Sequence, residues 1–169
     1  MSIEEHKKIR LKDVKVMVVT ISDTRTFETD KSGRMMCELL SKNFFEITKY
    51  LIVKDEQSDI RSTILSGIND SNVDVILTNG GTGISMRDVT FEVVEELIDR
   101  PITGFGELFR MLSYEEIGSA SMLSRAIGGV AKGTAIFSTP GSTGAVKLAM
   151  EKLILPELVH IVNELKKDG

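Results

Sequence analysis

The sequence predicts an α/β fold: a three-layer sandwich in which helices cover both faces of a mostly parallel central sheet containing one antiparallel strand. Short apolar runs typical of buried strands alternate along the chain with segments of helical periodicity. Three of these runs end in loops rich in glycine, hydroxyl side chains and aspartate. Strands end in this way at the ligand-binding edge of such sheets.

The first half of the chain alternates strands with helices three times. The helix expected after the second strand carries Ile60, Ile64 and Ile68, which recur every four residues and therefore share one face. In order, a strand, a helix, a strand, a helix, a strand and a helix are expected at residues 14–21, 32–42, 46–53, 55–68, 73–77 and 91–98.

The second half predicts an insertion, a hairpin and a helical tail. Pro101 begins an irregular stretch, helical through Leu112 and followed by a serine-rich segment at 119–125, that we expect to form a lid or a substrate wall. Residues 127–137, broken by Lys132-Gly133, alternate like a hairpin and supply the antiparallel strand. The tail after Gly141 is helical, and Pro156 should kink or divide it.

Length and composition indicate one domain at residues 14–169, preceded by a charged arm at residues 1–13. The 169 residues, 41% of them hydrophobic, include no proline-rich or low-complexity linker. A net charge of -4 and a shortage of aromatic side chains argue against a nucleic-acid partner. No apolar run approaches the roughly 18 residues of a membrane span, and the N-terminus is charged, so a cytoplasmic protein is expected.

Cysteine and histidine offer little catalytic chemistry. Cys37, the single cysteine, lies in a helix-like stretch and is interpreted as a small core residue rather than a nucleophile. The two histidines, His6 and His160, lie in the charged arm and the last helix. A histidine-based zinc site or triad is therefore not expected.

The loop at residues 78–83, Thr-Asn-Gly-Gly-Thr-Gly, follows an apolar strand and favours phosphate binding. Glycines permit positive φ angles and let backbone N–H groups approach an anion. Met86 stands where the dinucleotide fingerprint needs a small residue, and no Gly-Lys-Ser/Thr follows as a P-loop requires. A tight turn without a ligand fits the segment equally well.

Two other strands end in comparable loops. Residues 22–25 follow the first strand, and residues 138–144 follow the hairpin. If these strands are parallel neighbours of the glycine-loop strand, the three loops share one edge of the sheet. Such a crevice suits a phosphorylated, polar ligand.

Asp55 and Asp88 follow the second and third strands and so fall at the same edge, where two carboxylates can hold Mg²⁺ beside a triphosphate. Alternatively, each caps the helix that follows it. Arg87 either neutralises a phosphate or is solvated beside Asp88. Loop hydroxyls such as Ser22 are turn-stabilising residues as often as ligand contacts, and Glu107 fits an acid, an acceptor for a heterocycle or a helix-terminal charge.

Eight segments, spread in order over about 150 residues, resemble the MoaB/MogA molybdenum cofactor biosynthesis family. The first two look more like the MoaB branch than the MogA branch. The segments are Ser-Asp-Thr-Arg at 22–25, Asp-Lys-Ser-Gly at 30–33, Asp-Glu at 55–56, Thr-Asn-Gly-Gly-Thr-Gly at 78–83, Arg-Asp-Val-Thr at 87–90, Gly-Phe-Gly-Glu at 104–107, Leu-Ser-Arg at 123–125 and Pro-Gly-Ser at 140–142.

The resemblance implies a molybdopterin-binding α/β fold and a nucleotidyl transfer, in which molybdopterin and Mg-ATP give adenylyl-molybdopterin and pyrophosphate. By motif, Asp55 and Asp88 become the catalytic carboxylates and the Mg²⁺ ligands. The implied nucleotide and phosphate contacts are Gly80, Gly81, Thr82, Gly83, Pro140, Gly141 and Ser142. The implied pterin contacts are Ser22, Asp23, Glu107, Ser121 and Ser124.

The resemblance also leaves an alternative and implies partners. Some members of the MoaB branch lack transferase activity, so a non-catalytic molybdopterin-binding or carrier protein is the second hypothesis. A homo-oligomer built from trimers, most simply a hexamer, is expected, and a downstream molybdenum insertion protein is a candidate receiver of the product. Phe91 departs from the family pattern, which usually has proline there; this change should affect helix entry more than chemistry.

Overall fold

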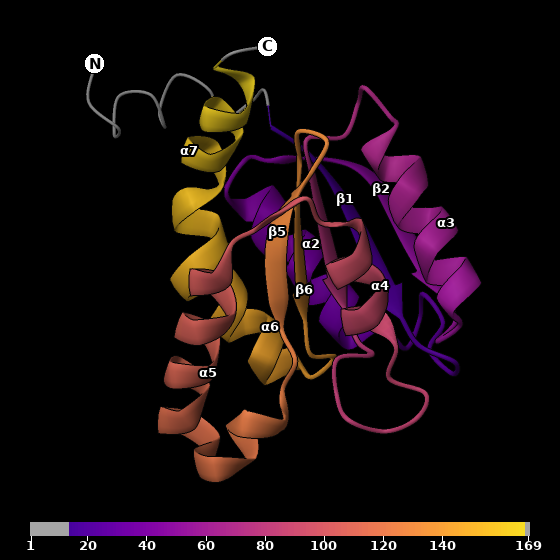
Figure 1. The fold of residues 1–169 in the computed structure, drawn as a ribbon, viewed down its shortest axis with the longest axis vertical. Helices are drawn as coiled ribbons and strands as arrows, with labels where there is room; N and C mark the ends of the chain where they lie inside the picture. Colours follow the sequence, from indigo (N-terminus) through magenta and orange to yellow (C-terminus); the bar gives the residue numbers. More distant parts are fainter. Residues whose placement is uncertain (1–13, 168–169) are drawn as a thin grey trace.

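The computed structural model describes residues 14–167 and contains one six-stranded sheet, in the order β2-β1-β3-β6-β5-β4 (Figure 1). The charged arm predicted at residues 1–13 lies outside the described residues. The strands are β1 (Lys15–Ile21), β2 (Glu46–Val53), β3 (Val75–Asn79), β4 (Arg100–Pro101), β5 (Ile127–Ala131) and β6 (Thr134–Thr139).

The sheet is mostly parallel, as predicted. β1 pairs in parallel with β2 and β3, and β3 pairs in parallel with β6. β5 is antiparallel to both β6 and β4, so it is the single strand that runs against the others. The two-residue strand β4 was not predicted.

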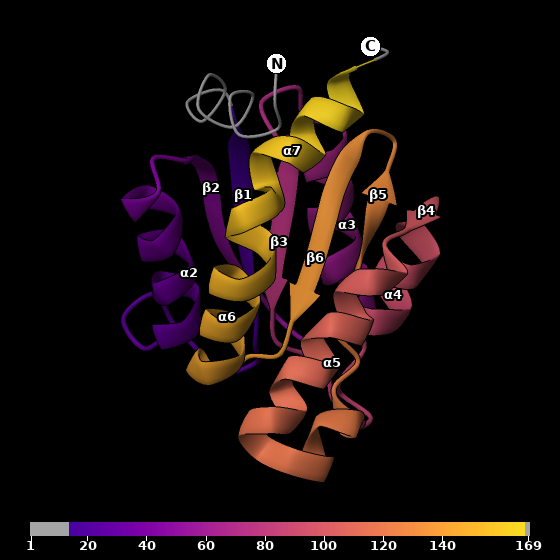
Figure 2. The same ribbon diagram turned by 90° about the vertical axis from the view of Figure 1, so that its left-hand side faces the viewer.

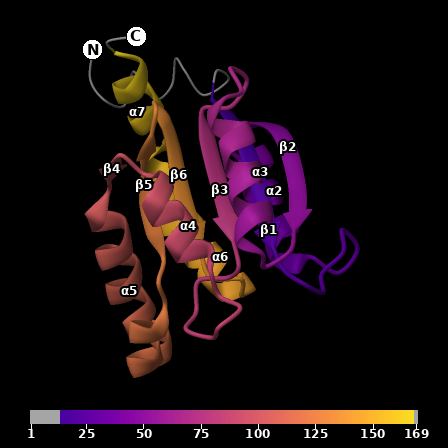
Figure 3. The same cartoon turned by 45° about the vertical axis from the view of Figure 1, so that its right-hand side comes forward.

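Helices cover both faces of the sheet, which confirms the three-layer prediction. Figure 2 shows α2 (Lys31–Lys42), α5 (Thr103–Ile117), α6 (Thr143–Ala149) and α7 (Leu155–Lys166) in front of the sheet, and Figure 3 shows α3 (Gln57–Ile68) and α4 (Thr90–Leu97) on the opposite face. Side chains along β1 alternate between the two faces of the sheet. Val16 and Val18 pack in the hydrophobic core on one face, and Met17 and Val19 pack in the core on the other face. None of the helices described within residues 14–167 is long and apolar enough to cross a bilayer.

The stretch after Pro101 is more regular than predicted. It contains the 15-residue helix α5 and a 3₁₀ helix, η2 (Gly118–Leu123). Two glycines in the first turns of α5 lower the helical propensity of this segment, so the sequence alone does not identify the whole helix. Packing compensates, because the Phe105 ring lies 4.9 Å from the Phe137 ring, and a Cβ on Gly106 would lie 2.9 Å from Ala126 O. The glycine thus allows α5 to approach the sheet closely.

The hairpin and the divided tail agree with the sequence. Lys132 and Gly133 have φ angles of 48° and 82°, as in a type I′ turn between β5 and β6. A π-helical turn, η3 (Met150–Ile154), separates α6 from α7, and Pro156 is the second residue of α7. The wide turn accommodates a residue that lacks a backbone donor.

Candidate functional site

Three loops meet at the carboxyl edge of the sheet, at the lower end of β1, β3 and β6 in Figure 2. The strands are parallel neighbours, with Thr20 aligned to Asn79 and Asn79 aligned to Thr139. Gly80 N donates to Thr139 O at 3.0 Å, and a Cβ on Gly141 would lie 3.3 Å from Gly80 Cα. The glycine loop therefore packs directly against the Pro140–Ser142 turn.

The glycine loop requires glycine for steric reasons. Gly80 and Gly81 have φ angles of 101° and 70°. A Cβ on Gly80 would lie 2.2 Å from Ile21 O, and one on Gly81 would lie 2.2 Å from Thr90 Oγ1. Thr90 Oγ1 donates to Gly80 O at 3.0 Å, and Thr90 N donates to Gly81 O at 3.1 Å. The first residue of α4 thus stabilises the glycine turn through two hydrogen bonds.

Asp55 and Asp88 both converge on this loop. A Cβ on Gly81 would lie 3.1 Å from Asp55 Oδ1, and one on Gly83 would lie 2.8 Å from Asp88 Oδ2. Burial raises the pKa of Asp55 above its ordinary value, and the nearby carboxylates of Asp23 and Asp88 raise it further. The edge therefore gathers negative charge where a cation would relieve it.

Neither aspartate caps a helix, so that alternative is wrong for both. The N-cap of α3 is Glu56 and that of α4 is Val89, and neither makes a side-chain capping bond. Asp88 Oδ2 instead accepts from Ser85 N at 3.0 Å and Ser85 Oγ at 2.6 Å. These bonds shape the exposed turn before α4 and leave Oδ1 of Asp88 for another partner.

Arg87 is neither free nor paired with its neighbour Asp88. It holds Asp23 in bidentate fashion, with Nε and Nη2 at 3.1 and 2.9 Å from Oδ2, and it donates to Glu56 Oε1 at 3.0 Å. The Arg87 hydrogen bonds hold the pKa of Asp23 below its ordinary value. Asp55 N also donates to Asp23 Oδ1 at 3.1 Å. Asp23 therefore lies beside Asp55, although the family resemblance grouped it with the pterin contacts.

We expect Asp55→Asn to raise the melting temperature of the ligand-free protein at neutral pH. A raised folded-state pKa means that the folded protein binds this proton more tightly than the unfolded chain does, so stability falls as pH rises from the unfolded pKa, about 3.9, through the higher folded value. Asparagine removes this cost. Calorimetry from pH 3.5 to 8 should show the gain above that window and none below it; a gain that is equal at every pH would contradict the electrostatic cause.

Comparison with known proteins identifies the family of the chain. The family model described as a probable molybdopterin binding domain matches residues 17–160. Molybdenum cofactor biosynthesis protein B from Bacillus cereus is 58% identical over 168 residues, or 99% of each chain. The chain belongs to the MoaB/MogA molybdenum cofactor biosynthesis family, in its MoaB branch.

Solved structures agree with this family assignment. A crystal structure of a molybdenum cofactor biosynthesis protein B superposes with a TM-score of 0.89 at 58% identity, covering 92% of this chain and 97% of that one. The tungsten cofactor synthesizing protein MoaB from Pyrococcus furiosus has a TM-score of 0.81 at 39% identity, covering 90% and 97% of the two chains.

The four serines predicted for the site of this MoaB-branch chain divide into two groups, two that stabilise turns and two that are wholly or partly buried. Ser22 Oγ accepts from Thr24 N and Arg25 N, and Ser142 Oγ accepts from Ala145 N to cap α6, so both stabilise turns. Ser121, in η2, is buried. Ser124 Oγ is buried and has no hydrogen-bond partner among the described residues. Because a buried hydroxyl without a partner is costly, Ser124 is the serine whose geometry favours a ligand.

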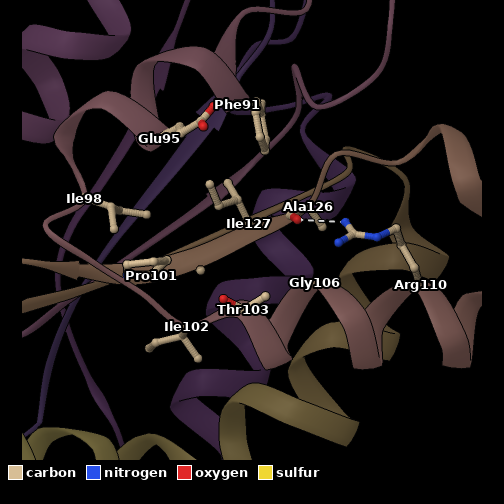
Figure 4. A pocket seen from close by; sticks show the side chains of 11 residues that line it. Phe91, Glu95, Ile98, Pro101, Ile102, Thr103, Gly106, Arg110, Ala126 and Ile127 are labelled. Carbon is tan, nitrogen blue, oxygen red and sulfur yellow. Dashed lines mark hydrogen bonds between the residues drawn. The ribbon is translucent and has the colours of Figure 1, made fainter.

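The structure does not bring Glu107 to the aspartates. It lies on the exposed side of α5 and makes no hydrogen bond or ion pair within residues 14–167. A separate cavity of about 280 Å³ lies between α4 and α5, where Figure 4 shows Phe91 and Glu95 facing Pro101 and Ile102, with Arg110 donating to Ala126 O. This cavity contains neither Asp55 nor Asp88.

A buried network beneath the loops was missed by the sequence reasoning. Arg25 Nη2 donates to Gly141 O at 2.9 Å, and its Nη1 contacts Ser32 Oγ. Ser32 Oγ donates to Asn79 Oδ1 at 2.9 Å, and Asp30, fully buried, accepts from Gly33 N. These side chains lie in segments that carry the family resemblance, but their pairing with one another requires the fold.

The contacts of Cys37 and His160 indicate structural rather than catalytic roles. Burial raises the pKa of the Cys37 thiol to about 11, so it remains protonated and weakly nucleophilic at neutral pH. His160 Nδ1 lies 3.0 Å from Glu157 on α7, and His6 lies outside the described residues.

Proposed function

We propose that this protein acts in molybdenum cofactor biosynthesis and adenylylates molybdopterin with Mg-ATP, releasing pyrophosphate. The observation that carries the proposal is the convergence of the Asp55 and Asp88 carboxylates on a glycine turn at the carboxyl edge of the sheet. Membership of a molybdopterin-binding family supports the pterin as one substrate. A downstream molybdenum insertion protein is the proposed receiver of the product.

The carboxylates fit a magnesium ion that is shared with a substrate. Residues 14–167 contain no group of three or more metal-binding side chains that could enclose an ion alone. Mg²⁺ is commonly held by one or two carboxylates together with substrate phosphates and water, and here Asp55 and Asp88 would be its protein ligands. Bound there, the ion would neutralise charge that develops on the transferring phosphate.

The transfer joins two anions, so positioning and charge neutralisation supply most of the catalysis. A terminal phosphate oxygen of molybdopterin attacks the α-phosphorus of ATP. A new P–O bond forms as the bond from the α-phosphorus to the bridging oxygen breaks, and that oxygen leaves with pyrophosphate. We assign the nucleotide phosphates to Gly80–Gly83 and Pro140–Ser142, and the pterin to the side of Glu107, Ser121 and Ser124, with Ser124 the strongest candidate of that set.

The direct test is incubation of the full-length protein with molybdopterin and Mg-ATP, followed by mass spectrometry. We expect a product whose mass exceeds that of molybdopterin by an adenylyl group, and none when Mg²⁺ is chelated. Asp59→Asn, which removes an exposed carboxylate in the first turn of α3, is a matched control and should leave product formation unchanged. Binding of molybdopterin without any adduct would reject the transferase proposal.

That outcome would favour the second candidate, a molybdopterin-binding or carrier protein without catalysis. One observation supports it: Asp88 Oδ2 is fully used by Ser85 N and Ser85 Oγ, as in an aspartate that only stabilises a turn. A carrier would keep this bond and would bind the pterin equally well with and without Mg²⁺.

We further propose self-association as a trimer-based hexamer. The outer side of α5 and η2 exposes apolar side chains, each more than half accessible: Met111, Tyr114, Ile117 and Met122. Apolar patches of this kind are typical of interfaces. Light scattering should therefore give about 112 kDa, six times the 18.6 kDa chain.

Ile117→Asp should dissociate the assembly toward smaller species. Phe44→Asp, which changes a still more exposed apolar side chain just after α2, is the control and should not. A wild-type monomer of about 19 kDa at micromolar concentration would reject this proposal.

A further inference from the structure

Arg125, which follows η2, connects that segment to the loop between β3 and α4. Its Nε donates to Gly83 O at 2.8 Å, and its Nη2 donates to Asp88 O at 2.8 Å. Its backbone N donates to Thr82 O at 2.9 Å. One planar group therefore fixes both ends of the loop that carries Asp88.

The orientation of the guanidinium is itself fixed by α4. Its Nη1 pairs with Glu92 Oε1, and the hydrogen bonds from Arg125 lower the pKa of Glu92. Its Cζ lies 5.2 Å from the centroid of the Phe91 ring, in cation–π geometry. Phe91 also lines the cavity of Figure 4.

The loop between the two anchored carbonyls is open to solvent. Ile84 and Met86 are 68% and 98% exposed. The position of the Asp88 carboxylate over Gly83 therefore depends on how the loop ends are held. Nε and Nη2 lie in one rigid plane, so they set the separation of the two carbonyls in a way that a single point donor would not.

We propose that Arg125 is a positioning residue for adenylyl transfer. It holds the Asp88 carboxylate in a fixed position relative to the glycine turn. It also connects this loop to the segment that contains Ser121 and Ser124, so that the distance between the nucleotide and the pterin is fixed. This inference rests on the proposed function. Arg125 binds loop carbonyls, Glu92 and the Phe91 ring rather than a substrate, so its loss should affect the chemical step more than binding.

Arg125→Lys tests the geometry because it keeps the charge and removes the planar fork. We expect kcat to fall roughly tenfold or more, since small misplacements of catalytic groups are costly, with the KM for molybdopterin within about twofold. Arg125→Ala should lose more activity and regain part of it when guanidinium ion is added in millimolar amounts. Arg61→Lys is the matched control: Arg61, on α3, pairs with Glu96, which lies on α4 as Glu92 does, but Arg61 makes no hydrogen bond or ion pair with the loop within residues 14–167, so kcat should not change.

A second measurement does not require activity. In the ligand-free full-length protein, Arg125→Lys should speed amide hydrogen exchange at residues 82–92, whereas Arg61→Lys should not. If the wild type forms no adduct, the proposed function fails, and the exchange result alone decides whether Arg125 anchors the loop. If the wild type is active and Arg125→Lys keeps its kcat, the inference is wrong. A fall in kcat that accompanies faster exchange throughout the protein would also overturn it, because the role would then be merely structural.

Discussion

Replacing Asp55 or Asp88 by asparagine should lower adenylyl transfer by roughly 10²-fold or more, which corresponds to about 2.7 kcal/mol of transition-state stabilisation. Asparagine keeps the shape of the side chain but removes the negative charge that a cation between protein and triphosphate needs. Both carboxylates lie against the glycine turn, so both losses act on the same phosphate group. Single-turnover assays with molybdopterin and ATP measure the effect.

The affinity for molybdopterin should change far less, because the ion mainly serves the nucleotide. Isothermal titration with the pterin checks this, and Asp59→Asn again supplies the control for loss of a surface carboxylate. Near-normal transfer in both asparagine variants, with an unchanged dependence on Mg²⁺, would show that these carboxylates are structural and that the site assignment is wrong. Asp55→Asn is therefore expected to make the protein more stable and less active, a separation that general damage to the fold would not produce.

Gly80→Ala should destabilise the protein by about 3 kcal/mol or more and lower Tm by roughly 10 °C. Its φ of 101° is unfavourable for a side chain, and the added Cβ would lie 2.2 Å from the backbone oxygen of Ile21. The first strand would have to move away from the third to relieve this contact. Thermal unfolding followed by circular dichroism measures the loss.

Gly133→Ala separates the two causes of this effect. Gly133 has a φ of 82° but no atom within 4 Å of the position that a Cβ would occupy, so it carries the conformational cost without the collision. We expect this variant to lose only about 1–2 kcal/mol. Equal losses at the two positions would mean that the close approach between β1 and the glycine turn does not contribute. If Gly80→Ala fails to fold at all while Gly133→Ala folds, the steric explanation stands.

The sequence predicted the layers of the fold because the strands needed for the site are apolar runs that end abruptly in loops. β1, β3 and β6 are neighbours in the sheet, as the interpretation of their loops required. The helix α5 was recognised only as far as Leu112, because Gly104 and Gly106 lower its propensity and only its burial against the sheet reveals their use.

Side-chain partners were harder to predict than positions. Arg87 adjoins Asp88 in sequence, but its hydrogen bonds go to Asp23 and Glu56, 64 and 31 positions away. The capping alternative for the two aspartates also needed backbone geometry, because it depends on which residue precedes the first helical turn. Periodicity and composition contain neither kind of information.

The bond between Arg25 and Gly141 spans 116 positions of the chain, and β6 joins the sheet between β3 and β5. In a chain that is still being synthesised, both aspartates and the glycine turn have left the ribosome long before the turn that packs on them exists. The edge of β3 that pairs with β6 lacks its partner until residues 134–139 have been made, and Arg25 lacks its acceptor until Gly141 has been made. The crevice can therefore form only after residues 134–141 have been made, so a chain that stops before them carries the acidic residues of the site without the geometry to use them.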